Sequence, residues 1–185
     1  FKIKEFYCFE VSPINFYYLK KKISKIGNKI KIFNFGLGET KSVLSFNQLE
    51  ESSSSTLIDI NQNSNYFKKK NKILSIFNLK KNKIKKINVE IDCLYDFMKK
   101  QSINKIDILK IDTEGYEFKV IKGAKDKIKD IRYIYFEHHF DDMLQKNYSF
   151  SNIHDYLTKN GFTKQFKVKM SFRKTFEYIY QNSKI

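Results

Sequence analysis

The chain has 185 residues, which is enough for one domain with a buried core. Hydrophobic residues make up 41% and aromatic residues 16% of it, which excludes a wholly disordered chain. No apolar run approaches the length of about 18 residues that a membrane-spanning helix requires. Cys8 and Cys93 lie in apolar segments, without CxxC or Cys/His clustering. We therefore predict neither a disulfide framework nor a zinc site, and expect a cytoplasmic protein with reduced thiols.

The formal net charge is +16, from 36 basic and 20 acidic residues. Such an excess can indicate binding to nucleic acids or anionic membranes. However, only Arg132 and Arg173 are arginines, whereas phosphate and base recognition relies on the bidentate guanidinium group. The lysines are spread along the chain, as an AT-rich coding sequence would produce. We expect mostly solvated surface charge, with non-specific binding to polyanions at low salt and no specific nucleic-acid partner.

The first half of the chain predicts strands around one clear helix. An apolar strand over residues 6–9 ends at Glu10, and Ser12 followed by Pro13 is typical of a helix start. Apolar residues at helical spacing extend this helix to about residue 26, where Gly27 and Asn28 end it. Beyond it we predict a strand over 30–35, a break at 36–38, a short strand over 41–46, a polar loop or insertion over 47–71 and a charged segment over 80–86.

The second half alternates strands and helices more regularly. We predict strands over 87–91, 106–111 and 131–136, helices from Asp92 through Met98, over 114–122 and over 152–159, and an antiparallel hairpin over 162–168 and 175–180. This alternation predicts one α/β domain over residues 1–185 with a largely parallel sheet.

Three predicted strands carry an acid at their C-terminal end: Glu10, Asp112 and Glu137. Open α/β sheets bind their ligands at this end of the parallel strands. Glu10 could accept hydrogen bonds from two ribose hydroxyls. It could equally do no more than complement the positive end of the following helix.

The densest polar cluster is the segment KIDTEGYE, residues 110–117. In it, Glu114 and Glu117 are three residues apart and would share a helix face. Gly115 permits close approach of the backbone to a ligand. The alternative is structural, with Asp112 or Thr113 capping a helix. We interpret the segment as functional.

Glu137 is followed by two histidines, His138 and His139. Side chains of adjacent strand residues point to opposite faces, so at most one of the two can serve as a base or ligand in one site. His154 lies on a predicted helix without an acidic or cysteine partner nearby, and we interpret it as structural.

Together these segments resemble the FkbM-type family of S-adenosylmethionine-dependent methyltransferases. FEVSPINFYYL at 9–19 is similar to the family's FEPxPxxFxxL, and DILKIDTEGYE at 107–117, followed by VIKGA at 120–124, is similar to DllKiDvEGxE…vlkGa. Shorter matches, at 35–38, 52–55, 89–94, 134–137 and 161–162, occur in the same order. The resemblance runs from about residue 6 to residue 162.

The resemblance implies a Rossmann-like class I methyltransferase sheet of seven strands with helices on both faces. In the family, a first strand and a glycine-rich turn precede the segment that contains Glu10. They have no counterpart in this sequence, so we expect a partial domain that lacks this strand. Its place would be the sheet centre, between the strands that end at Glu10 and Asp112.

The resemblance also implies methyl transfer from S-adenosylmethionine to a hydroxyl, on a sugar or another small metabolite. It places the cofactor at Glu10, Ser12, Leu37 and Asp112, catalysis at Asp112, Glu137 and His138, and acceptor binding at Glu114 and Glu117. A metal held by Asp112 and Glu137 is conceivable, but no ligand spacing indicates one, and we predict none.

Two other interpretations stay open. One is a lysine-rich nucleic-acid-binding module, although acids rather than lysines occupy the strand ends. The other is a methyltransferase-like domain without catalytic activity. The sequence identifies neither the methyl acceptor nor the oligomeric state.

Overall fold

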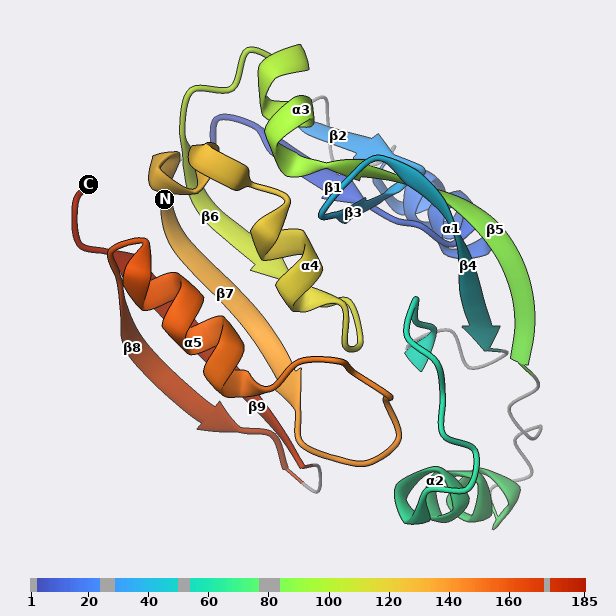
Figure 1. Cartoon of the computed structure of the whole chain (residues 1–185). Coiled ribbons are helices and arrows are strands. Elements are labelled where there is room, and N and C mark those ends of the chain that lie inside the picture. The colour runs from blue at the N-terminus through green and yellow to red at the C-terminus, as the bar shows by residue number, and fades with distance from the viewer. Residues whose placement is uncertain (1–2, 24–28, 50–53, 77–83, 172–173) are drawn as a thin grey trace.

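The computed structural model describes residues 3–23, 29–49, 54–76, 84–171 and 174–185. Figure 1 shows its elements, which are β1 (Phe6–Phe9), α1 (Pro13–Ile23), β2 (Ile30–Phe33), β3 (Gly36–Gly38), β4 (Ser42–Leu49), α2 (Asn65–Ile76), β5 (Ile84–Cys93), α3 (Leu94–Lys100), β6 (Ile106–Ile111), α4 (Glu117–Lys122), a 3₁₀ helix η2 (Lys125–Asp130), β7 (Ile131–His139), α5 (Phe150–Lys159), β8 (Phe162–Lys169) and β9 (Thr175–Asn182). The helix end predicted at 26–28, the first residues of the serine run and the start of the charged segment fall outside the described residues.

The strands form three hydrogen-bonded groups, in the orders β1-β2, β3-β5-β4 and β6-β7-β9-β8. The pairs β1-β2, β3-β5 and β6-β7 are parallel, whereas β4-β5, β7-β9 and β8-β9 are antiparallel. The predicted α/β class and the C-terminal hairpin are therefore confirmed. The prediction of a largely parallel sheet is wrong, because β4 pairs antiparallel with β5 and β9 pairs antiparallel with β7. Within the described residues, β1 pairs with β2 alone and β6 with β7 alone.

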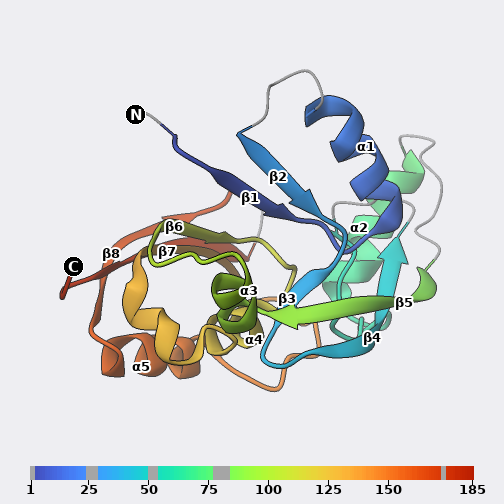
Figure 2. The same cartoon turned by 90° about the horizontal axis from the view of Figure 1, so that it is seen from above.

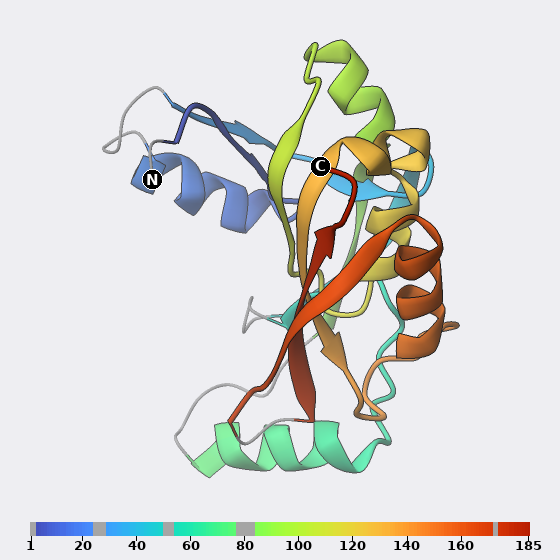
Figure 3. The same cartoon turned by 90° about the vertical axis from the view of Figure 1, so that its left-hand side faces the viewer.

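The main core lies between the four-stranded group and its helices. Figures 2 and 3 show α3, α4 and α5 on one side of the strands and α1 on the opposite side. The core contains Ile134 and Phe136 from β7, Tyr178 and Tyr180 from β9, and Ile153 and Leu157 from α5, all buried. In the described part of the chain, no helix is both long and apolar enough to span a bilayer.

The segment Gly36–Gly38 is a strand, β3, and not the predicted break. Its glycines let β3 approach β5 closely, since a Cβ at Gly36 or Gly38 would lie 2.8 or 2.7 Å from side-chain carbons of Ile91. A Cβ at Gly123 would overlap the carbonyl oxygen of Gly38, at 1.9 Å, so α4 also packs directly on this strand. Close packing, which a local pattern does not reveal, makes these glycines necessary.

The predicted loop or insertion over 47–71 is wrong at both of its ends. Its first residues belong to β4, and its last belong to the helix α2. Between them, Thr56 forms a bridge with Asn47, and Ile60 forms one with Leu144. Phe67 packs with Met143 and Leu144 in a small core of its own. The polar composition hides these contacts, because the apolar partners come from the loop after β7.

The starts of α3 and α4 differ from the predictions. Cys93, and not Asp92, is the N-cap residue of α3. Helix α4 begins at Glu117, and its N-cap residue Tyr116 makes no side-chain capping bond. The predicted helix over 114–122 is thus three residues too long, and neither alternative capping residue, Asp112 or Thr113, caps it.

Candidate active site

The C-terminal end of β6 lies beside β7, because these strands are parallel and Ile111 pairs with Phe136. Strand β7 continues past its predicted end at residue 136 and ends at His139. Asp112 and Glu137 directly follow this pair. The Asp112 side chain is 51% exposed and its Oδ2 lies 3.8 Å from Nζ of Lys110. Partial burial and the neighbouring Glu137 carboxylate raise the pKa of Asp112. The structure thus brings two predicted catalytic carboxylates to one edge, with Asp112 accessible from solvent.

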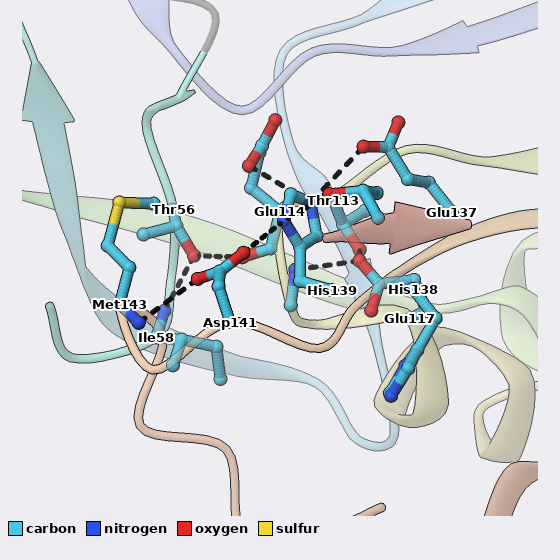
Figure 4. Close-up of polar contacts among 12 residues, drawn as sticks. Thr56, Ile58, Thr113, Glu114, Glu117, Glu137, His138, His139, Asp141 and Met143 are labelled. Atoms are coloured by element: carbon cyan, nitrogen blue, oxygen red, sulfur yellow. Dashed lines mark hydrogen bonds and ion pairs between the residues drawn. The ribbon is translucent and has the colours of Figure 1, made fainter. Parts of the chain in front are cut away.

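Behind this edge, two carboxylates converge on one imidazole (Figure 4). Nε2 of His139 lies 3.3 Å from Oε2 of Glu114 and 3.3 Å from Oε1 of Glu137. Glu114, Glu137 and His139 expose only 9%, 8% and 4% of their surface. Glu137 and His139 share a face of β7 because side chains alternate along a strand, and Glu114 reaches them from the turn before α4.

A third carboxylate holds the other side of the same ring. Nδ1 of His139 lies 3.3 Å from Oδ2 of Asp141 and 3.2 Å from Oγ1 of Thr175. Oδ1 of Asp141 accepts the Met143 N–H at 3.0 Å, which fixes that carboxylate. Although burial opposes it, hydrogen bonds to Asp141 and Glu137 raise the pKa of His139 to about 10. The bond from His139 likewise lowers the pKa of Asp141 against the effect of burial.

A strained turn places Glu114. Its φ is +50°, and Gly115 follows with a φ of +98°. Oγ1 of Thr56 donates to the Glu114 carbonyl at 2.6 Å. Oε1 of Glu117 accepts the Gly115 N–H at 2.7 Å and the Thr113 hydroxyl at 3.0 Å. A left-handed conformation costs free energy at a residue other than glycine, so these bonds keep the Glu114 side chain directed at His139.

Glu117 itself lies inside the protein. Its side chain is 0% exposed, and its Oε2 accepts the Tyr148 hydroxyl at 2.7 Å. The expected shared helix face with Glu114 is wrong, because Glu114 lies outside α4. The Glu117 carboxylate accepts hydrogen bonds from Thr113, Gly115 and Tyr148, so Glu117 holds the turn that presents Glu114.

His138 points away from this cluster, to the other face of β7 (Figure 4). Its ring lies 4.8 Å from that of Phe140 and 5.9 Å from that of Tyr148, and it is 2% exposed. Burial and the Lys146 ammonium lower the pKa of His138 to about 3. Nζ of Lys146 lies 3.5 Å from Nε2 of His138 and also donates to the His139 carbonyl. The two histidines therefore have different surroundings, as the strand alternation predicts.

The predicted cofactor residues Glu10, Ser12 and Leu37 lie in the N-terminal part of the fold. Oε1 of Glu10 accepts the Ser12 N–H at 2.8 Å, and burial raises the pKa of Glu10. Ser12 is fully buried: its Oγ accepts the Asn15 N–H at 3.2 Å and donates to Oε1 of Gln48 at 2.5 Å. The predicted start of α1 is confirmed. Leu37 lies in β3 and is buried in the main core.

A hollow opens next to the cluster. Its volume is about 340 Å³, and it lies between α2 and the loop after β7. Lys69, Lys174 and Asp141 are among its lining residues. Asp141 also contacts Nδ1 of His139, so the hollow is separated from the His139 ring by the Asp141 side chain.

Sequence reasoning missed three parts of this arrangement: the joint placement of His139 with Glu114 and Glu137, and the contacts of Asp141 and Thr56. A signal existed for His139, because the period of two along β7 puts it on the face of Glu137. Asp141 and Thr56 had none, since their contacts depend on loops that come together only in the folded chain.

Asp112 directly after β6, and Glu137 near the end of the adjacent parallel strand β7, define an α/β protein with a candidate ligand site at this edge of its strands. The chain matches the family model described as methyltransferase FkbM domain over residues 2–164 and belongs to this family. The resemblance drawn from the sequence is confirmed. A comparison with curated proteins gave no match, and neither did a comparison with solved structures.

Proposed function

We propose that this FkbM-type methyltransferase domain transfers a methyl group from S-adenosylmethionine to a hydroxyl of a sugar or another small metabolite. The observation that carries the proposal is Asp112 at the end of β6, half-exposed and adjacent to the buried Glu137 in a family of methyltransferases. A methyl group on a sulfonium is already electrophilic. The protein therefore has to align the acceptor and remove its proton.

The ends of β1 and β3 are the proposed cofactor side. Glu10 follows β1 directly, and the Ser12 N–H fixes one of its oxygens. A carboxylate held in this way can accept hydrogen bonds from ribose hydroxyls, which supports the fit of the cofactor there. Ser12 contributes through Glu10 and the start of α1, and Leu37 contributes by packing β3 into the main core.

We further propose that the strands belong to one Rossmann-like sheet with a further strand and a glycine-rich turn between β1 and β6. The parallel pairs β1-β2 and β6-β7, with helices on both sides, support this arrangement. The unshared edges of β1 and β6 in the described part of the chain support it as well.

At the acceptor side, Asp112 is the residue that we propose to orient the hydroxyl and take its proton. Its pKa is raised, which brings a carboxylate closer to the operating range of a general base. Glu114 and Glu137 line the same side from the buried cluster, and Glu117 acts by holding the turn. His138 has the weakest support as a base, because its ring faces the opposite side of β7.

The test is methyl transfer by the full-length protein, with labelled S-adenosylmethionine and a panel of hydroxylated metabolites. In Asp112→Asn we expect kcat to fall by about 10²–10⁴-fold, the usual contribution of a positioned base, with little change in cofactor affinity. The control is Asp107→Asn, an exposed residue of the same strand, which should stay as active as wild type. Near-wild-type turnover in Asp112→Asn contradicts the assigned role. Absence of transfer to every acceptor, together with no cofactor binding, contradicts the proposed function.

A further inference from the structure

We propose that Glu114, Glu137 and His139 bind one divalent transition-metal ion. This inference goes beyond the proposed function, and it departs from the expectation of no metal site that the sequence alone supports. The binding of the ion is independent of methyl transfer, whereas its use on an acceptor rests on the proposed function.

The first argument is the convergence of the donors. One carboxylate, Glu114, comes from the turn before α4, while the second carboxylate and the imidazole come from the end of β7. One donor atom from each of the three residues lies within 4.8 Å of the others. Two donors that bind the same ion at about 2.1 Å are about 3.0–3.4 Å apart in octahedral or tetrahedral geometry. The distances of 3.3 Å from Nε2 of His139 to both carboxylates match this spacing.

The second argument is the contact geometry of Nε2 of His139. Nε2 of His139 carries at most one N–H, and it faces two carboxylate oxygens at equal distances of 3.3 Å. Charge-assisted hydrogen bonds are shorter, at about 2.7–2.9 Å. Two nearly buried carboxylates also carry a large desolvation cost. A divalent cation between the three donors would compensate both charges.

The third argument is the outer layer of the site. On the far side of the His139 ring, Nδ1 faces the buried Asp141 carboxylate, which the Met143 N–H holds in turn. Metal-binding histidines commonly donate their second ring N–H to a carboxylate, which fixes the tautomer and directs the other nitrogen at the ion. Figure 4 shows this order, from Asp141 through His139 to the two glutamates.

The fourth argument is that the site is preformed. The Thr56 hydroxyl and the left-handed backbone of Glu114 fix the turn. Two oxygens and one nitrogen suit Mn²⁺, Fe²⁺ or Zn²⁺ better than the all-oxygen shell that Ca²⁺ prefers. Three protein ligands leave coordination positions open, and an acceptor oxygen bound in one of them would lose its proton more easily.

A second group of close donors provides the matched control. Asp92, Cys93 and Asp96 also lie within 4.8 Å of one another, at the start of α3. They are near neighbours in the sequence, and the Cys93 thiol donates to Oδ2 of Asp96 at 2.9 Å. Asp96 is exposed, so Asp96→Asn can be made without disturbing the core.

The experiment is titration of the metal-free full-length protein with Mn²⁺, followed by calorimetry and by electron paramagnetic resonance. We expect one Mn²⁺ per chain, with nitrogen hyperfine coupling from an imidazole ligand. Glu114→Gln and His139→Gln should each weaken binding by at least about tenfold, and Asp141→Asn by about 10–100-fold. Asp96→Asn should leave the affinity unchanged.

The alternative is that His139, as an imidazolium, neutralises the carboxylates without a metal. It predicts that the folded wild-type protein binds neither Mn²⁺ nor Zn²⁺ at millimolar concentration, and that result overturns the proposal. Bound Mn²⁺ without nitrogen coupling, or binding that Asp96→Asn abolishes, overturns it as well. Because the coupling is measured on wild-type protein, the test holds even if a variant fails to fold. Near-wild-type turnover in the Asp112→Asn assay contradicts the proposed function of Asp112 but leaves the metal-binding proposal unaffected.

Discussion

Two strand-to-helix connections of this domain look alike in the sequence and are stabilised differently. In each, an apolar strand ends at an acid, and a helix follows within a few residues: Glu10 leads from β1 to α1, and Asp112 leads from β6 to α4. In the first connection, Glu10 accepts the Ser12 N–H, and Ser12 accepts the Asn15 N–H. These two bonds span two and three residues, and the Ser12 hydroxyl adds one distant bond by donating to Oε1 of Gln48.

The second connection is held from a distance. Helix α4 has no side-chain cap, and Glu114 and Gly115 in the turn before it adopt left-handed conformations. Their positions depend on Thr56, which is 58 residues from Glu114, and on Tyr148, which is 31 residues from Glu117. Local bonds suffice to start a helix, whereas a turn that carries reactive groups in a strained conformation needs partners from elsewhere.

The largest effect that this comparison predicts is on the turn before α4. Glu117→Ala should lower the free energy of unfolding by at least about 3 kcal/mol, because it removes a buried acceptor from Gly115, Thr113 and Tyr148. Urea denaturation measures this loss. The control Glu90→Ala, an exposed residue of β5, should change stability by less than about 0.5 kcal/mol. A loss below about 1 kcal/mol in Glu117→Ala would mean that the turn does not depend on this carboxylate.

An intermediate effect is expected at the end of β1, and on binding rather than on folding. Glu10→Ala should weaken S-adenosylmethionine binding to the full-length protein by about 1–3 kcal/mol, the cost of hydrogen bonds lost from a charged group. Calorimetry checks this. Glu5→Ala is the matched control, because Glu5 is an exposed acid just before β1 that pairs with Lys31. Unchanged affinity in Glu10→Ala removes Glu10 from the cofactor site.

The smallest effect concerns the local cap. Ser12→Ala should destabilise the protein by about 1 kcal/mol, the typical value of an N-cap hydroxyl, as the Asn15 N–H loses its acceptor. Thermal denaturation measures the change. A loss of cofactor affinity larger than the loss of stability would instead assign Ser12 to the cofactor site directly. A loss of several kcal/mol would show that its bond to Gln48 matters more than the local cap.

Sequence patterns predicted most strands and helices, since apolar periodicity follows from each segment alone, as in β6, β7 and α5. They failed where a segment is stabilised by distant partners. The glycines of β3 led to the prediction of a strand break, because the local sequence does not show their close contacts with Ile91 and Gly123. The start of helix α2 was predicted as part of a loop, because its packing partners Met143 and Leu144 lie far along the chain.

The sequence by itself determined the family, the α/β class and the positions of Glu10 and Asp112 at the ends of β1 and β6, because the order of short segments and the period of side chains express these features. The tertiary structure alone decided which acids meet. Glu114 lies in a strained turn and not in the predicted helix, and Glu117 is buried. His139, and not His138, contacts the carboxylates of Glu114 and Glu137. The physical reason is that convergence of charged groups depends on strand register and on loops that pack against each other, and neither is contained in any one segment.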